Sequence, residues 1–259
     1  MWDPVQYGLF AGERARPFAE LLARVRAEQP AHVVDLGCGD GVLTATLLDR
    51  WPGASVVGVD SSPAMLAQAS ARAVPGRLSF QPGTIEEWLP ELPVDVLVSN
   101  AALHWLPGHP TLLRRLLAAV APAGWLAVQM PANHNAPTHT ELASLCRSPR
   151  WGDRLGVYGR RDSPVLDPAA YLALLVGSSQ VIDVWETTYL HVLTGSDPVL
   201  EWVRGTALRP VLAALAGDQA AEADFLAEYG ERLRAAYPVT PHGTVLPFRR
   251  IFVVAQRLP

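Results

Sequence analysis

Short apolar runs alternate with amphipathic segments through the first half of the chain. This rhythm is typical of a parallel sheet whose buried strands are covered by helices on both faces. The apolar runs predict five strands, near residues 32–36, 55–60, 78–81, 94–99 and 124–130. The segments between them predict helices near residues 41–51, 62–73 and 110–120. We therefore expect an α/β fold.

The pattern changes after residue 130. Residues 131–167 are rich in Pro, Asn, His and Arg, which favours loops and short helices outside the sheet. Further elements are predicted around this segment: a helix near 15–27, a helix near 168–176, a strand at 182–193, helical structure over 197–236 and a strand at 244–257. We interpret residues 1–259 as a single domain. Its lid over the carboxyl ends of the strands comes from three segments, residues 1–28, 131–167 and 197–243.

A glycine-rich turn follows the first predicted strand. Gly37, Gly39 and Gly41 leave room for a ligand against bare backbone, and the helix that follows presents unpaired amide groups. Asp60 ends the second predicted strand, where an acid is placed to accept hydrogen bonds from a ribose diol. The two signals together indicate a cofactor that contains a nucleoside.

The glycine spacing and one acid indicate which cofactor this is. The turn reads G-x-G-x-G, whereas dinucleotide sites use G-x-G-x-x-G. Asp35 lies two residues before Gly37; a carboxylate there disfavours a pyrophosphate and suits an ammonium or a sulfonium. The pattern therefore favours S-adenosylmethionine over a nicotinamide cofactor, and a structural turn that binds nothing is the remaining alternative.

Composition excludes several classes of function. A net charge of −4 and a pI near 6.0 argue against a nucleic-acid or anionic-membrane surface. The two cysteines are too few for a metal cage or a disulfide framework, and Cys38 fits the turn as a small residue. We therefore expect no metal. The sequence shows no signal peptide and no apolar run of about 20 residues, so we expect a cytoplasmic protein.

The end of the fourth strand offers candidates for the reaction. Asn100 lies where the sheet opens, and the small Ala101 and Ala102 leave space for a methyl group. His104 is either a general base or a packing and hydrogen-bonding group beside Trp105. Methyl transfer depends mainly on orienting the reactants, for which a lid is suited.

Arginines and aromatic residues fall in the predicted lid. All 21 basic residues are arginine, and several stand at element boundaries: Arg14, Arg16, Arg209, Arg249 and Arg250. Converging guanidinium groups suit a polycarboxylate, whereas surface salt bridges are the alternative for each one alone. Four aromatic residues are candidate pocket walls: Tyr7, Trp105, Tyr189 and Trp202.

The motifs at residues 34–41, 60–65 and 99–105 resemble those of the class I S-adenosylmethionine-dependent methyltransferases. The resemblance implies a Rossmann-like seven-stranded, mostly parallel sheet whose last strand is antiparallel. It implies a cofactor site formed by Tyr7, Arg16, Asp35, Gly37, Cys38, Gly39, Asp60, Ser61, Met65, Gly83, Thr84, Ile85, Asn100 and Ala101. Where such proteins place an Asp near the adenine, this chain has Gly83-Thr84-Ile85, so Thr84 or Glu86 would supply that contact.

Motifs in the predicted lid, which are found along the whole chain, make the resemblance more specific. They are similar to those of methyltransferases that esterify a small polycarboxylate. Such a substrate is already ionised at neutral pH, so no general base is required. The implied substrate-binding residues are Arg16, His104, Trp105, Asn133, Tyr189, Arg209 and Arg250. Of these, Arg16, Arg209 and Arg250 are expected to hold the two carboxylates that do not react. Methylation of a quinone or a phenol, and a non-catalytic cofactor-binding protein, remain alternatives.

Overall fold

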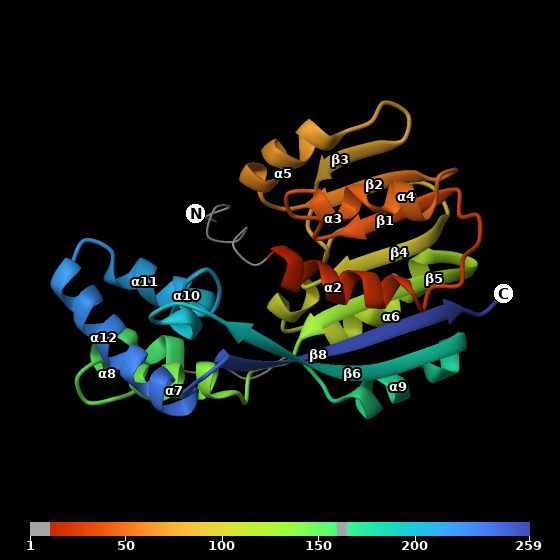
Figure 1. The fold of residues 1–259 in the computed structure, drawn as a ribbon. Coiled ribbons are helices and arrows are strands. Elements are labelled where there is room, and N and C mark those ends of the chain that lie inside the picture. Colours follow the sequence, from red (N-terminus) through yellow and green to blue (C-terminus); the bar gives the residue numbers. More distant parts are fainter. Residues whose placement is uncertain (1–10, 160–164) are drawn as a thin grey trace.

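The computed structural model describes residues 11–159 and 165–259, and Figure 1 traces the chain through them. Tyr7, one of the predicted cofactor-binding residues, lies outside the described residues. Side chains are described from residue 15 onward.

Five parallel strands form the first part of the sheet. They are β1 (His32–Leu36), β2 (Ser55–Asp60), β3 (Leu78–Pro82), β4 (Val94–Asn100) and β5 (Val120–Pro131). Their order in space is β3-β2-β1-β4-β5, so the strand order reverses between β1 and β4. Ligands of open α/β sheets bind at such a reversal, outside the carboxyl ends of the strands.

Two long strands complete the sheet. β8 (Gly243–Arg257) lies between β5 and β6 (Ser179–Leu193) and runs antiparallel to both. This arrangement confirms the expected mostly parallel sheet with an antiparallel last strand, and a short strand, β7 (Val239–Thr240), adds to it at β8. β8 pairs with β5 only from Arg250 onward, so its first half extends with β6 past the carboxyl edge.

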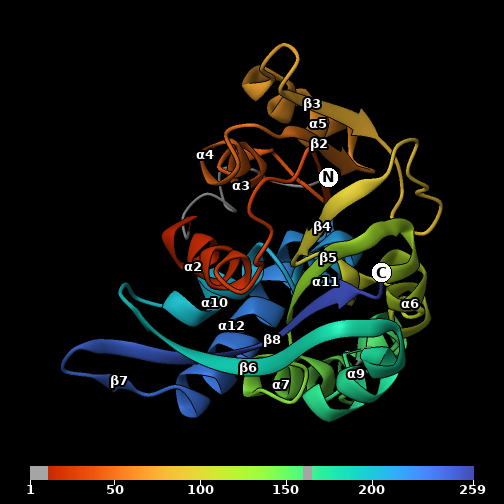
Figure 2. The same cartoon turned by 90° about the vertical axis from the view of Figure 1, so that its right-hand side faces the viewer.

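Helices cover both faces of the sheet. Figure 2 shows α6 (His109–Ala119) and α9 (Pro168–Leu175) on one side, with α2 (Ala11–Leu22), α3 (Val42–Ala45) and α4 (Leu47–Arg50) on the other. α5 (Pro63–Ala69) follows β2. α2 buries Phe18, Leu21 and Leu22 in one cluster with residues of β1, β4 and β8. The described part of the predicted lid segment 1–28 is thus a layer on the sheet face.

The remaining helices form a separate apolar cluster near the carboxyl ends of the strands (Figure 1). They are α7 (Pro137–Cys146), α8 (Gly152–Leu155), α10 (Pro198–Arg204), α11 (Arg209–Leu215) and α12 (Gln219–Ala236). Phe225 and Tyr229 of α12 are fully buried in this cluster. The described parts of two predicted lid segments, 131–167 and 197–243, therefore supply this helical cluster, while β7 near the end of the second segment joins the sheet.

Two predicted helices are divided in the structure. The stretch 41–51 forms α3 and α4, and the hydroxyl of Thr46 between them donates to the carbonyl of Leu43 at 2.6 Å. The stretch 197–236 forms three helices. Gly217, with φ of 93°, ends one of them, and the Asp218 side chain caps the next by accepting from the amide of Ala221.

Candidate active site

The glycine turn is fixed to the neighbouring strand by its backbone. The amides of Gly37 and Cys38 both donate to the carbonyl of Val59, at 2.8 and 3.1 Å. Gly37 has φ of +80°, and a Cβ built on it would lie 2.3 Å from the Cβ of Ala102. Only glycine therefore fits where the turn meets the segment after β4.

Asp60 connects this turn to the start of α5. One carboxylate oxygen accepts from the amide of Gly39 at 2.9 Å, and the other accepts from the amide of Ser62 at 2.8 Å. Each oxygen keeps a lone pair after one such bond, so the carboxylate retains capacity for a diol. A Cβ on Gly39 would meet nothing within 4 Å, which leaves open space beside the turn.

Asp35 is buried beneath the turn, with an exposed fraction of 3%. Its Oδ2 accepts from the hydroxyl of Thr44 at 2.6 Å. Burial raises the pKa of Asp35 from 3.8 to about 6, the Thr44 hydrogen bond opposes this shift, and the negative charge of Asp60 adds to it. A cationic ligand beside Asp35 would favour its ionised form.

The other predicted cofactor residues after β2 and β3 lie around the same edge. Met65 is buried, and its amide donates to the hydroxyl of Ser62, whereas Ser61 is exposed. The amide of Gly83 donates to the carbonyl of Asp60 at 3.1 Å. The hydroxyl of Thr84 donates to the Glu87 carboxylate at 3.1 Å, so Thr84 already has a local partner.

Two further predicted residues of this group pack in the interior. Ile85 is partly buried against the apolar cluster between the sheet and α6. Cys38 is buried, and burial raises the pKa of its thiol above the usual range. A thiol with a raised pKa is a poor nucleophile, which agrees with its interpretation as a small packing residue.

The carboxyl end of β4 presents an unsatisfied polar group. The Oδ1 of Asn100 is buried, and among the residues that the structure describes nothing donates a hydrogen bond to it. Ala101 adopts φ of 54°, and its amide donates to the carbonyl of Gln129 at 2.9 Å. Left-handed backbone is uncommon for alanine, so this segment is held in place by its surroundings.

Arg250 is buried at the carboxyl edge, with an exposed fraction of 4%. Its guanidinium donates to the side-chain oxygen of Gln129 at 3.1 Å and lies 4.7 Å from the ring centre of Phe248 and 6.0 Å from that of Tyr189. A guanidinium in this setting is a strong attractor for an anion because little water screens its charge.

Arg16 approaches the same tyrosine from α2. Its guanidinium lies 4.9 Å from the ring centre of Tyr189 and forms a 2.9 Å ion pair with Glu20, and its side chain is 68% exposed. The hydroxyl of Tyr189 donates to the same carboxylate at 2.7 Å. Arg209 instead starts α11 in the helical cluster. The structure thus brings Arg16 and Arg250 to one tyrosine and places Arg209 on a different layer.

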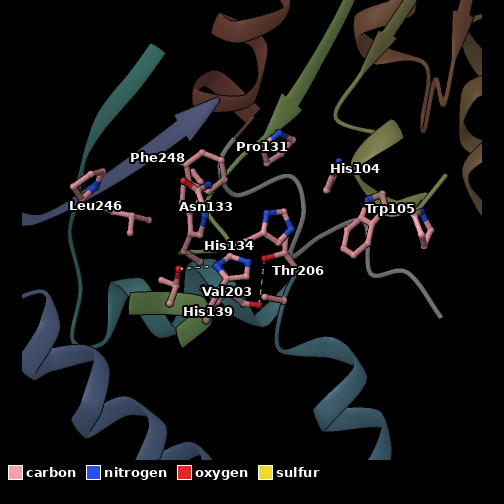
Figure 3. Close-up of a pocket in the computed structure, with 15 residues that line it drawn as sticks. His104, Trp105, Pro131, Asn133, His134, His139, Val203, Thr206, Leu246 and Phe248 are labelled. Atoms are coloured by element: carbon pink, nitrogen blue, oxygen red, sulfur yellow. Dashed lines mark hydrogen bonds between the residues drawn. The ribbon is translucent and has the colours of Figure 1, made fainter. Parts of the chain in front are cut away.

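A cavity of about 270 Å³ lies between the carboxyl edge and the helical cluster (Figure 3). Its walls come from the segments after β4 and β5, from α7 and α10 with the residues after it, and from β8. The lining residues are His104, Trp105, Pro107, Pro131, Asn133, His134, Thr138, His139, Trp202, Val203, Thr206, Ala207, Leu246, Pro247 and Phe248.

Sequence reasoning had identified some of these lining residues and missed others. His104, Trp105 and Asn133 were predicted as substrate-binding residues and Trp202 as a wall, and all four line the cavity. His134, Thr138, His139 and Thr206 were not predicted. The available signal was the cluster of histidines that follows the fifth strand, at residues 134 and 139.

The described residues form neither a candidate metal site nor a helix that could span a membrane. Within residues 11–159 and 165–259, no group of three or more His, Cys, Asp or Glu side chains is arranged to hold a metal ion. No helix in the same part of the chain combines the length and the apolar character that crossing a membrane requires.

Comparison with solved structures supports the fold. The E. coli protein YjhP is 21% identical with a TM-score of 0.55, and the match covers 95% of this chain and 92% of that one. The YcgJ protein of Bacillus subtilis is 17% identical with a TM-score of 0.54, over 95% and 99% of the two chains. Identities this low support a shared fold alone.

Comparison by sequence identifies the family. A model described as a methyltransferase domain matches residues 33–124. Trans-aconitate 2-methyltransferases from Streptomyces coelicolor and Streptomyces avermitilis are 50% and 52% identical to this chain. Each match covers 99% of this chain, and 86% and 97% of the respective relatives. The chain therefore belongs to the trans-aconitate 2-methyltransferase family, which confirms the resemblance to class I methyltransferases.

Proposed function

We propose that this chain transfers the methyl group of S-adenosylmethionine to one carboxylate of trans-aconitate, giving a monomethyl ester and S-adenosylhomocysteine. One observation carries the proposal: the chain is 50% identical, over 99% of its length, to an enzyme named for this reaction. The adjacent cofactor edge and cavity support it, because two reactants need neighbouring sites.

The residues at the carboxyl edge fit the cofactor. The open space beside Gly39 admits a ligand against the backbone, and Asp60 has acceptor capacity for a ribose diol. The buried Oδ1 of Asn100 needs a hydrogen-bond donor, which a ligand would supply. A cationic ligand beside Asp35 would lower the raised pKa of this residue and stabilise its carboxylate. When bound, S-adenosylmethionine supplies an electrophilic methyl group on a sulfonium.

The residues between β2 and β4 would enclose the adenosine. We assign Ser61, Met65, Gly83, Thr84 and Ile85 to this part of the site, since they lie on the segments that follow β2 and β3, Met65 within α5. We assign Gly37, Cys38, Gly39 and Asp35 to the methionine end, with Asn100 and Ala101 between the two reactants. Tyr7 and Arg16 complete the proposed set from the N-terminal side.

The substrate needs orientation rather than activation. Its carboxylates are ionised at neutral pH, so the chain has no proton to remove before attack. Arg250, with Arg16 beside the same Tyr189 ring, is assigned to a carboxylate that does not react. Pairing the attacking carboxylate with a guanidinium would reduce its nucleophilicity. We retain Arg209 as the third member of this proposed clamp. His104, Trp105, Asn133 and Tyr189 stay in the proposed substrate site as residues outside the clamp.

The helical cluster is assigned the role of a lid. Its α10 wall and the residues after it face the sheet edge across the cavity, so closure would exclude water from the reacting groups. Exclusion of water strengthens the attraction between buried guanidinium groups and carboxylates.

The direct test is methyl transfer by the purified chain. Radiolabelled S-adenosylmethionine is offered with trans-aconitate, with citrate, with a simple dicarboxylate and with a phenol. The proposal requires label in an alkali-labile ester of trans-aconitate. Label in the phenol alone, or no transfer to any acid although S-adenosylhomocysteine binds, would overturn it.

A variant tests the role of Arg250. Arg250→Met keeps the length of the side chain and removes its charge, so we expect the KM for trans-aconitate to rise by on the order of tenfold or more. The matched control is Arg72→Met, since Arg72 is an exposed residue that follows α5. Binding of S-adenosylhomocysteine shows whether the variant is folded, and an unchanged KM would remove Arg250 from the clamp.

A further inference from the structure

The cavity between the sheet edge and the helical cluster has a chemistry that the arginine clamp does not use. Its lining residues, as the structure describes them, include three histidines, an asparagine and two threonines, but neither a carboxylate nor an arginine. Arg250 lies behind this wall, with its guanidinium against the ring of Phe248. An anion in the cavity would thus meet polar donors without repulsion from an acid.

Asn133 presents a donor to this space. Its Oδ1 accepts from the amide of Arg249 at 2.7 Å, which fixes the orientation of the side-chain amide because only the oxygen accepts an N–H. The residue is 6% exposed, and its Nδ2 is buried with no acceptor among the described residues. A buried donor without an acceptor is unfavourable, so the site favours a ligand that supplies one.

His134 and His139 lie beside this amide. Their ring centres are 5.5 Å apart, and Figure 3 shows both rings at the centre of the cavity wall. The hydroxyl of Thr138 lies 3.1 Å from Nδ1 of His139. A neutral imidazole carries one N–H and a protonated imidazole carries two, so protonation of the pair adds donors and positive charge that suit a carboxylate.

Hydrogen bonds with α12 and with the residue after it hold the segment that carries these residues. The hydroxyl of Tyr229 on α12 donates to the carbonyl of Thr138 at 2.5 Å. The amide of Thr138 donates to the hydroxyl of Tyr237 at 3.3 Å. These buried bonds hold the start of α7 against α12, and a held segment loses little conformational entropy when a ligand binds.

We propose that this cavity is a second carboxylate subsite, in which Asn133, His134 and His139 bind the carboxylate of the polycarboxylic acid that lies farthest from the transferred methyl group. The inference rests on the proposed function and assigns part of its substrate site to residues distinct from the arginines. Trp202 and Phe248 provide apolar walls for the carbon chain of the substrate.

The sharpest variant is Asn133→Asp. It is nearly isosteric and keeps an oxygen for the Arg249 amide, but it replaces the two N–H donors with a second carboxylate oxygen. The matched control is Asn135→Asp, which adds the same charge to the same segment at an exposed residue outside the lining. His139→Leu tests the imidazole, with His242→Gln at an exposed turn as its control.

The measurement is calorimetric binding of trans-aconitate to protein saturated with S-adenosylhomocysteine. We expect Asn133→Asp and His139→Leu to weaken binding of trans-aconitate by about tenfold or more, while affinity for S-adenosylhomocysteine and the behaviour of both controls stay unchanged. In turnover, the loss should fall on KM rather than kcat.

The outcomes separate this inference from the proposed function. Wild-type protein that binds trans-aconitate without methylating it would overturn the function, and weaker binding by both variants would still support the subsite. Unchanged binding of trans-aconitate by both variants would overturn the subsite while the function stands. Wild-type protein that does not bind trans-aconitate would overturn both.

Discussion

Replacement of Asp35 by Asn should change how stability depends on pH. The pKa of Asp35 is raised by burial from 3.8 to about 6, so the folded state holds the proton more tightly than the unfolded state. Its contribution to stability is therefore complete below pH 3.8 and is lost as the pH rises through about 6. Linkage places the loss between about pH 4.5 and about pH 7.5 at about 2 kcal/mol for this shift.

The assay is urea unfolding of both proteins at these two pH values. Asn does not titrate, and its side-chain oxygen can still accept from the hydroxyl of Thr44. Because other titrating groups cancel in the comparison, the stability of the variant relative to wild type should be about 2 kcal/mol more favourable at the higher pH. A difference that does not change with pH would refute the raised pKa of Asp35 in the folded state.

Asp35→Asn should weaken cofactor binding at neutral pH, although it makes the relative stability of the protein more favourable there. A cation beside Asp35 favours the carboxylate, so wild-type affinity for S-adenosylmethionine should fall as the pH drops below about 6. Asp35→Asn should bind the cofactor more weakly at neutral pH and show a flat profile. Calorimetry across this range measures both, and a tight, pH-independent variant would remove Asp35 from the methionine end.

Three further substitutions test other parts of the structure. Gly37→Ala should destabilise the chain by more than about 2 kcal/mol in thermal unfolding, because its Cβ would lie 2.3 Å from that of Ala102, and near wild-type stability would contradict the contact. Burial lowers the pKa of His109 below 6.5, so stability should fall as the pH drops past 6.5, and His109→Gln should reduce that fall in urea titrations. Tyr229→Phe removes the hydrogen bond to the Thr138 carbonyl and should lower the free energy of unfolding by about 1 kcal/mol. It should also raise the KM for the acid more than the KM for the cofactor, and equal changes in the two would argue against the anchoring role.

The sheet could be predicted from the sequence because its signals are local. β1, β2 and β4 are short, mostly apolar runs, and runs of this kind are typical of strands in a sheet that is buried on both faces. The sequence pattern did not predict where two helices are divided, because the divisions come from single residues and the spacing of apolar residues continues across them. Thr46 donates to a backbone carbonyl, and Gly217 adopts a left-handed conformation; neither interrupts the pattern of apolar residues.

The sequence could not predict which of the candidate arginines are buried at the site and which pair with acidic residues. Arg249 and Arg250 are neighbours on β8, so their side chains point to opposite faces of the sheet. Arg249 pairs with Glu186 and Asp167, whereas Arg250 is buried beside Gln129. Composition cannot distinguish the two, because the difference depends on which face of the strand is covered. His134 and His139 were missed for a related reason, since the segments that meet at the cavity are distant in sequence.

Most of the residues assigned to the cofactor precede most of the cavity wall in the chain, and the two groups meet at the end of β4. The methyltransferase-domain model matches residues 33–124, which include the cofactor edge, while most of the cavity wall lies after them. Ala102 touches the glycine turn, and His104 lines the cavity two residues further on. Substitutions after residue 130 can therefore change which acid is bound without altering the cofactor site. A change between Asn100 and His104 would disturb both, because this strained segment forms a wall of each.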